Sequence, residues 1–303
     1  MSSNASQKRS SFEFQSEDSI HVGIKHPKIT ERSHDKRIII LLIITPIWTL
    51  LFTLIPIFLK FQGFAADIYR YLEPMISLPL QYYIMVTSEV FIDPTQYGRK
   101  FLFGLTERSF LNIWFLIGAA IYAQGSGIYS TAILAKHAIE NVLLPNPEIV
   151  QQYPKFDEVA YYYRETLQHI IGLYSYATGY VIMTLAQLFA YRRQKHDGLD
   201  SRKGIIGWIL GGILFGILNA SVAIEFPLVV IIYILLIGIS LTIFLLKSKV
   251  MFSKGRRLVL QSYLIGYATT LVIVLIWIAA VGGFKDKKSV GLFVKGGSNS
   301  TRN

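Results

Sequence analysis

The sequence contains no cysteine among its 303 residues, and charged residues make up only 16% of it. The missing cysteines exclude disulfide bonds, thiolate metal ligands and cysteine nucleophiles. The small charged fraction is equally informative, because soluble globular proteins carry about 25% charged residues. Since 52% of the residues are hydrophobic, the composition excludes an ordinary water-soluble protein and indicates a polytopic membrane protein, whose first partner is the lipid bilayer.

Long hydrophobic runs recur along the chain. A helix needs about 20 apolar residues to cross the hydrocarbon core of a bilayer, and seven runs approach this length. They extend from about Ile38 to Leu59, Met75 to Ile92, Phe110 to Ala135, Ile170 to Tyr191, Gly204 to Ala220, Phe226 to Leu246 and Leu258 to Val281. The predicted fold class is therefore all-α, a polytopic membrane protein with seven transmembrane helices. The second run is the weakest, and a re-entrant hairpin is its alternative.

The distribution of basic residues predicts the orientation, because Lys and Arg gather in cytoplasmic segments. With seven spans and a cytoplasmic N-terminus, the inside segments hold 20 of the 30 Lys and Arg residues and the outside segments hold 10. Without the second span the split becomes 15 to 15. We therefore expect a cytoplasmic N-terminus and a lumenal C-terminus. The net charge of +11 then needs no nucleic acid to explain it.

Three regions follow from this topology. Residues 1–37 are Ser-rich and charged and are expected to form a disordered cytoplasmic tail. Residues 38–281 form the seven-helix transmembrane domain, with a lumenal loop at 136–168. Residues 282–303 form a short lumenal tail. The orientation is opposite to that of a G-protein-coupled receptor, and no internal repeat indicates a transporter with inverted halves.

One polar cluster lies where the lumenal loop meets the fourth span. Tyr161, Glu165 and His169 are spaced by four residues, which places them on one face of a helix. A carboxylate one turn before an imidazole can be half of a metal site, part of a proton relay or a hydrogen-bonded pair. Without a third ligand in view the plain pair is favoured, so no metal and no cofactor are expected.

Other polar candidates lie within the spans or between them. Glu225 lies between the fifth and sixth spans, and an unpaired carboxylate at membrane depth needs a partner or water. Tyr122, Ser126 and Ser130 form a ladder of hydroxyl groups on one face of the third span. Helix packing accounts for most of this ladder, because a serine nucleophile needs an adjacent base and the span contains no histidine.

The fifth span contains two pairs of glycines spaced by four, Gly207 with Gly211 and Gly212 with Gly216. Such pairs let two helices approach closely within a membrane. The partner helix can belong to the same chain or to a second copy, so the pairs suit internal packing and a homodimer contact alike.

From about Gly104 to Val281 the chain resembles the ceroid-lipofuscinosis neuronal protein 6 family, which comprises seven-span proteins of the endoplasmic reticulum membrane. The resemblance rests on Gly118-Ala119 with Ile121, the string Tyr161-Tyr162-Tyr163-x-Glu165-x-Leu167-x-His169, Glu225 between two spans, and a basic loop before a last span containing Trp277. The tyrosine string is its most specific part. The family has histidine and aspartate at the third-span positions that match Tyr122, Ser126 and Ser130, so this chain resembles a divergent relative.

The resemblance implies a non-enzymatic cargo adaptor that helps export newly made lysosomal enzymes from the endoplasmic reticulum, as a homodimer and with a companion membrane receptor. The missing histidine and aspartate argue against enzymatic activity. The alternative is an intramembrane lipid-modifying hydrolase or transferase. It would require Glu165, His169, Glu225 and Ser126 to converge on one cavity.

Overall fold

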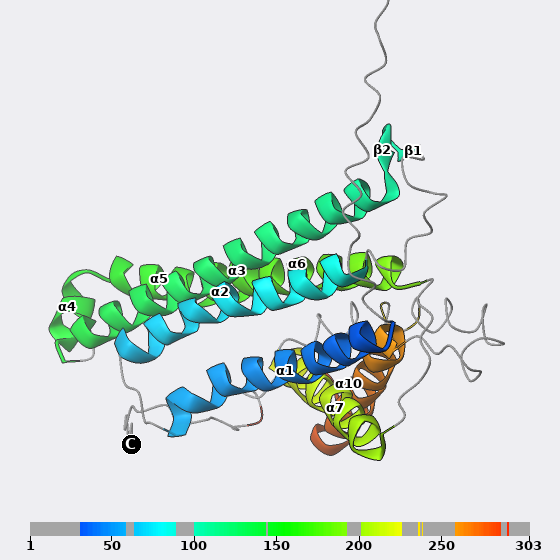
Figure 1. Cartoon of the computed structure of the whole chain (residues 1–303). Coiled ribbons are helices and arrows are strands. Elements are labelled where there is room, and N and C mark those ends of the chain that lie inside the picture. The colour runs from blue at the N-terminus through cyan, green and yellow to red at the C-terminus, as the bar shows by residue number, and fades with distance from the viewer. Residues whose placement is uncertain are drawn as a thin grey trace, which may run out of the picture.

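The computed structural model describes residues 31–58, 64–88, 100–143, 145–192, 201–225, 236, 238, 258–285 and 290, and this part of the chain is mostly helical (Figure 1). The elements are α1 Glu31–Phe58, α2 Phe64–Thr87, β1 Lys100–Leu102, β2 Leu105–Thr106, α3 Glu107–Leu143, α4 Pro147–Gln152, α5 Lys155–Tyr161, the π-helix η3 Tyr162–Leu173, α6 Tyr174–Ala190, α7 Arg202–Glu225 and α10 Leu258–Val281. The predicted helical fold class is confirmed for the described residues.

Three of the described helices are long and apolar enough to cross a membrane: α3, α7 from Arg202 to Ile224, and α10. They correspond to the third, fifth and seventh predicted runs and support a membrane protein. The sixth predicted run, Phe226 to Leu246, lies outside the described residues except for Leu236 and Gly238. Residues 1–30 and most of 282–303 also lie outside them, so the count of seven spans stays a prediction.

The first two helices begin earlier than predicted. α1 begins at Glu31 rather than at Ile38, so the end of the predicted tail is helical. α2 begins at Phe64 rather than at Met75 and runs through Pro74 and Pro79. The predicted starts were those of the hydrophobic runs, which mark where a helix meets apolar surroundings. A helix can begin earlier, because charged residues such as those before Met75 are also compatible with a helix.

The predicted loop at 136–168 is largely helical. α3 continues to Leu143, well beyond Ala135, and is followed by α4 and α5. Pro145 disfavours a helical conformation of the residue before it, which is consistent with the end of α3 here. α4 then starts with Pro147 in its first turn, where a missing backbone N–H costs nothing. This end of the molecule is therefore an ordered helical cap.

The helices form two layers (Figure 1). One layer contains α2, α3 and α6, and the other contains α1, α7 and α10. A core around Phe115 and Met183 joins the helices of the first layer. A larger core joins the two layers, with Tyr191, directly after α6, and Tyr267 of α10 both fully buried in it.

Glycines bring α3 and α6 into close contact. A Cβ atom added to Gly179 of α6 would meet the backbone of Tyr122 on α3, and one added to Gly125 of α3 would meet the backbone of Tyr176 on α6. Gly118 makes a similar contact, because its added Cβ would lie 2.9 Å from the Gly179 carbonyl oxygen. Only glycine permits such an approach. The crossing places Tyr122 beside Tyr176.

The glycine pairs of α7 both contact helices of the same chain. Gly207 and Gly211 face α1, and an added Cβ at Gly211 would lie 3.0 Å from the Leu42 carbonyl oxygen. Gly212 and Gly216 face α10, where an added Cβ at Gly216 would lie 2.5 Å from a backbone oxygen. A homodimer through the same glycines would have to displace one of these helices. Homodimer formation itself stays a prediction.

η3 continues directly into α6. The residues at both of its ends have helical backbone angles, so α5, η3 and α6 form one rod. π-helices are rare and usually occur as single turns, often at functional sites, whereas η3 covers 12 residues. It carries Glu165 and His169, two of the residues predicted from the sequence.

Contacts near the helix ends show the relative directions of two helix pairs. Trp208 Nε1 donates to the Leu258 carbonyl oxygen at 3.3 Å near the starts of α7 and α10, and Thr270 donates to the Gly216 carbonyl oxygen further along both helices. These two helices therefore run parallel. α3 and α6 run antiparallel, because Arg192 Nη2 after α6 lies 2.5 Å from Glu107 Oε1 at the start of α3.

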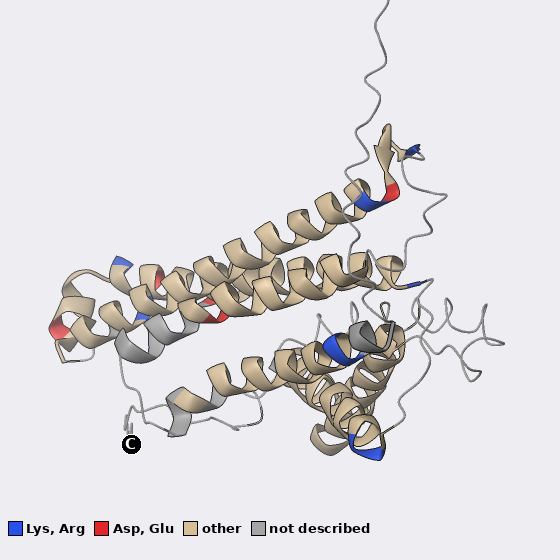
Figure 2. Cartoon of the chain, in the orientation of Figure 1, with Lys and Arg blue, Asp and Glu red and all other residues tan. Residues whose placement is uncertain are grey.

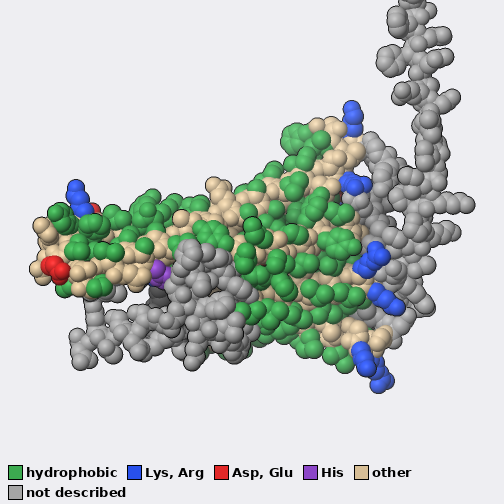
Figure 3. Space-filling view, turned by 60° about the vertical axis from the view of Figure 1, so that its left-hand side comes forward, with side chains coloured by type: hydrophobic (Ala, Val, Ile, Leu, Met, Phe, Trp, Pro, Cys, Tyr) green, Lys and Arg blue, Asp and Glu red, His purple; other side chains and the backbone are tan. Residues whose placement is uncertain are grey.

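Basic residues gather at the end of the bundle where α1, α3 and α7 begin (Figure 2). We call this the basic end. Its described members are Lys36, Arg37, Lys100, Arg108, Arg192, Arg202 and Lys203. On the face in Figure 3, hydrophobic side chains cover most of the surface between this end and the α4 end.

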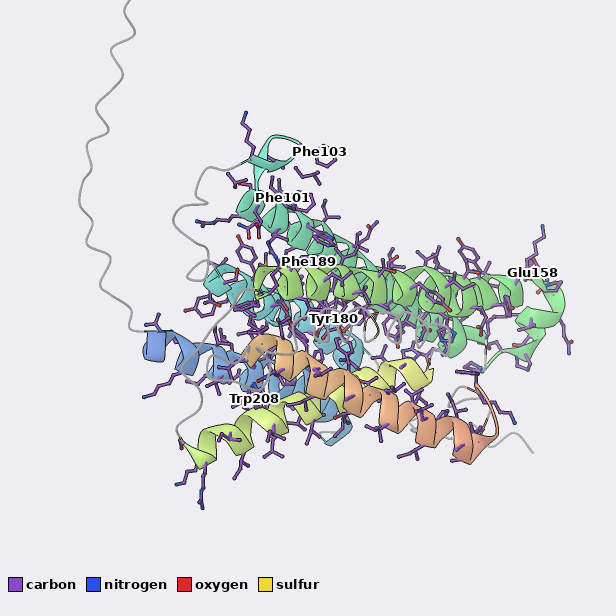
Figure 4. The ribbon with its side chains drawn as sticks, turned by 90° about the vertical axis from the view of Figure 1, so that its right-hand side faces the viewer. Phe101, Phe103, Glu158, Tyr180, Phe189 and Trp208 are labelled. Carbon is purple, nitrogen blue, oxygen red and sulfur yellow. The ribbon has the colours of Figure 1, made fainter. Side chains whose placement is uncertain are left out.

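A short hairpin precedes α3 at the basic end. β1 and β2 are antiparallel, and their turn contains Phe103 and Gly104, both with positive φ. Phe103 is 86% exposed (Figure 4). The Thr106 hydroxyl then accepts a hydrogen bond from the Ser109 backbone N–H at 3.2 Å, which caps the first turn of α3.

Candidate functional site

A cavity of about 130 Å³ lies between the two helix layers and is lined by α1, α2, α3, α6 and α7. Its polar lining includes Glu73, Ser77, Gln81, Tyr122, Tyr176 and Asn219. One water molecule needs about 10–15 Å³ on this measure, so the cavity has room for several waters or for a small polar head group.

Glu73 of α2 is the one carboxylate among the described residues that line the cavity. The Tyr122 hydroxyl lies 2.9 Å from Glu73 Oε1 and 3.0 Å from Oε2. The Tyr122 and Tyr176 hydroxyl oxygens are 2.7 Å apart. A phenol carries one proton, so when Tyr122 donates to the carboxylate, Tyr176 donates to Tyr122. This chain of hydroxyl groups stabilises a negative charge at Glu73.

Aromatic rings form one wall of the cavity. The ring centroids of Tyr122 and Tyr176 are 4.2 Å apart, and those of Tyr122 and Tyr180 are 6.5 Å apart. Tyr180 continues the wall to Phe215 of α7, at 6.1 Å (Tyr180 is labelled in Figure 4). The carboxylate therefore shares the cavity with four aromatic residues of three helices.

Asn219 of α7 lines the cavity and is 6% exposed. Its Nδ2 atom has no hydrogen-bond partner within the described part of the chain. An unsatisfied buried amide costs about 1–3 kcal/mol. Ser221, which also lines the cavity, is exposed, so within the described part of the chain the cavity reaches the surface of the bundle beside α7.

A second polar cluster adjoins the cavity through Gln81. Gln187 Nε2 of α6 donates to Gln81 Oε1 at 2.9 Å and to the Gln81 carbonyl oxygen at 2.8 Å. Gln187 Oε1 in turn accepts a hydrogen bond from the Tyr263 hydroxyl of α10. Gln187 is fully buried, so its amide connects α2, α6 and α10 inside the bundle.

Helical spacing aligns the α2 side of the site. Glu73, Ser77 and Gln81 are four residues apart and therefore lie on one face of α2. The glycine crossing between α3 and α6 then supplies the tyrosines opposite that face. The site is thus an outcome of helix packing rather than of one local motif.

The structure places the sequence-predicted site residues in different environments. Tyr122 is 3% exposed and lies in the cavity site. His169 Nδ1 lies 3.3 Å from Glu165 Oε2 on η3, and Tyr161 is 58% exposed at the end of α5. Ser126 is buried in α3 and does not line the cavity. Glu225, expected in a loop, is the last residue of α7, and the structure describes only its backbone.

Sequence reasoning missed Glu73, Gln81, Gln187 and Asn219. The apolar run that marked the second span starts at Met75, two residues after Glu73, so this carboxylate fell outside it. A signal was present, because Glu73, Ser77 and Gln81 form a polar stripe at helical spacing.

The described residues contain no group of three or more His, Asp or Glu side chains arranged to hold a metal ion. What the cavity does offer is a carboxylate, two connected phenols and an amide donor that has no partner among the described residues. These groups can hold a cation and an oxygen acceptor at the same time.

Comparisons of the chain with protein-family models, with curated proteins and with solved structures find no match.

Proposed function

We propose that this protein is a non-enzymatic scaffold of the endoplasmic reticulum membrane that acts as a cargo adaptor in the export of newly made lysosomal enzymes. The observation that carries the proposal is an exposed aromatic surface on the helical cap. The sequence resemblance supplies the cargo class and the expectation of a companion membrane receptor.

The helical cap reaches beyond the bilayer. α3 has 37 residues, which corresponds to about 55 Å at 1.5 Å per residue. The hydrocarbon core accounts for about 30 Å of this length. With the Glu107–Arg192 pair at the cytoplasmic boundary, α4 and α5 lie outside the membrane on the lumenal side.

The cap exposes large apolar side chains beside its polar ones. We define the cap surface as Tyr153, Phe156, Val159, Tyr161 and Tyr162, each between 44% and 58% exposed. Glu158, on the same helix, lies at the far end of the bundle (Figure 4). Aromatic residues are enriched at protein interfaces, and clustered exposed apolar groups mark interaction sites. A lumenal protein is the partner that this position favours.

Two features support seven spans with a cytoplasmic N-terminus. Most of the described basic residues gather at the end where α1, α3 and α7 begin (Figure 2), as expected for a cytoplasmic face. α7 and α10 run parallel. The chain therefore leaves α7 at one end of the bundle and enters α10 at the other end. This arrangement supports the sixth crossing predicted between them.

The cap surface can be tested by substitution. We expect the double variant Phe156→Ser and Tyr161→Ser to reduce crosslinking to newly made lysosomal hydrolases by at least about tenfold, because aromatic anchors contribute most of the affinity of an interface. Export of the hydrolases, followed by pulse-chase, should slow in parallel. Phe103→Ser is the matched control, since Phe103 is exposed at the basic end. Equal crosslinking in all three proteins would contradict the proposal.

The topology has a reporter in the sequence. Asn299-Ser300-Thr301 follows Val281 by 18 residues, and a lumenal tail would be glycosylated there. Asn4-Ala5-Ser6 should stay unmodified. The measurement is an endoglycosidase-sensitive shift on a gel that disappears in the Thr301→Ala variant. A glycan at Asn4, or protease access to the C-terminus from the cytosol, would refute the orientation.

The lipid-modifying enzyme is less well supported. It required Glu165, His169, Ser126 and Glu225 around one cavity, and the described cavity is lined by none of the first three. Glu165 and His169 contact each other instead. The geometry therefore favours the scaffold.

A further inference from the structure

The proposed scaffold function makes no use of the cavity around Glu73, although polar groups are costly to bury there. A carboxylate at membrane depth needs a positive partner or water. The described residues that line the cavity include no Lys, Arg or His. The Tyr122 hydroxyl stabilises the carboxylate but does not neutralise it. A cation from outside the chain would supply the missing charge.

The aromatic wall favours an organic ammonium group over a metal ion as the bound cation. An ammonium group over the face of a tyrosine or phenylalanine ring is attracted by the ring quadrupole, more strongly when water is excluded. Tyr122, Tyr176, Tyr180 and Phe215 provide such rings beside the carboxylate. A metal ion would instead need several oxygen ligands, usually six or more for Ca²⁺. The combination of one carboxylate with aromatic rings favours an organic ammonium.

Asn219 indicates that the ligand also carries a hydrogen-bond acceptor. Its Nδ2 atom is buried in the cavity lining without a partner in the described residues, and it needs an oxygen acceptor. A simple amine offers none, whereas an amino alcohol offers a hydroxyl oxygen. The amide and the carboxylate come from α7 and α2, so one head group between these helices could satisfy both.

The size and position of the cavity indicate how the rest of the ligand lies. A volume of about 130 Å³ accepts a head group but not a whole lipid. The cavity reaches the exposed Ser221 beside Leu218 and Val222 of α7. An alkyl chain leaving there would enter the surrounding lipid.

We infer that this cavity binds the head group of a long-chain amino alcohol of the sphingoid-base class. Its ammonium group pairs with Glu73 against the aromatic wall, and a hydroxyl oxygen accepts a hydrogen bond from Asn219. The alkyl chain passes α7 into the bilayer. This binding site goes beyond the proposed scaffold function and does not depend on it.

The test uses the purified full-length protein in phosphatidylcholine nanodiscs and measures saturable binding of radiolabelled sphinganine. Glu73→Gln is expected to weaken binding by at least about tenfold, since a hydrogen-bonded charge pair is lost. Glutamine keeps an acceptor for Tyr122, so the variant should fold. Tyr176→Phe should weaken binding less. Glu148→Gln, at an exposed carboxylate of α4, is the control and should bind normally.

Competing ligands distinguish the contribution of the Glu73 carboxylate from that of the Asn219 amide. Uncharged N-acetylsphinganine should compete at least about tenfold less well than sphinganine. Asn219→Leu should weaken sphinganine but not dodecylamine, which has the charge without the hydroxyl groups. Thermal unfolding confirms that each variant is folded. Unsaturable binding, equal binding by wild type and Glu73→Gln, or equal competition by N-acetylsphinganine would each overturn the inference and leave a cavity that holds water.

Discussion

Replacing Gly125 with alanine is expected to destabilise the protein by about 2 kcal/mol or more. The added Cβ would lie against the Tyr176 backbone nitrogen, 2.7 Å from the Gly172 carbonyl oxygen and 2.8 Å from the Ser175 carbonyl carbon. Backbone atoms of a packed helix cannot rotate away as a side chain can, so α3 and α6 must separate. Separation also pulls Tyr122 away from Tyr176, so the hydroxyl chain to Glu73 is lost.

Gly127 is the matched control, two residues further along the same helix. A Cβ added there meets nothing within 4 Å. Gly127→Ala should leave stability unchanged or raise it, because alanine favours a helix over glycine by up to about 1 kcal/mol. Denaturant unfolding in detergent measures both variants. Equal stability of the two variants would mean that the α3–α6 crossing does not depend on close backbone contact.

Replacing Gln187 with leucine is expected to lower the free energy of unfolding by about 2 kcal/mol or more. Leucine has nearly the same size but removes the bonds to Gln81 and the acceptor for the Tyr263 hydroxyl. Each buried group left without a partner costs about 1–3 kcal/mol. Thermal unfolding should show the loss, and the contact of α2 and α10 with α6 should weaken, which crosslinking between engineered cysteines can measure.

Gln168→Leu provides the comparison. Gln168 is 8% exposed, and its Oε1 atom has no partner among the described residues. Removing a buried amide oxygen that makes no hydrogen bond should be neutral or stabilising. A similar loss of stability in both variants would indicate that the effect comes from changing a buried glutamine to leucine and not from the hydrogen bonds.

Local patterns predicted the features that depend on neighbouring residues. The seventh run, Leu258 to Val281, coincides with α10 because both ends of that helix are also ends of an apolar run. The spacing of Glu165 and His169 predicted the proximity that the structure has, since residues four apart face each other on a helix. The hydroxyl ladder of the third span drew attention to Tyr122 for the same reason.

By itself the sequence determined the membrane class and the positions of most of the described helices. Only the tertiary structure decided that Glu73 meets Tyr122, 49 residues away, and that Asn219 of α7 joins them. The physical reason is that lipid is as apolar as leucine, so side chains that face lipid and side chains that face another helix look alike in the sequence. Which helix faces meet is decided by close backbone contacts, such as those of Gly125 and Gly179.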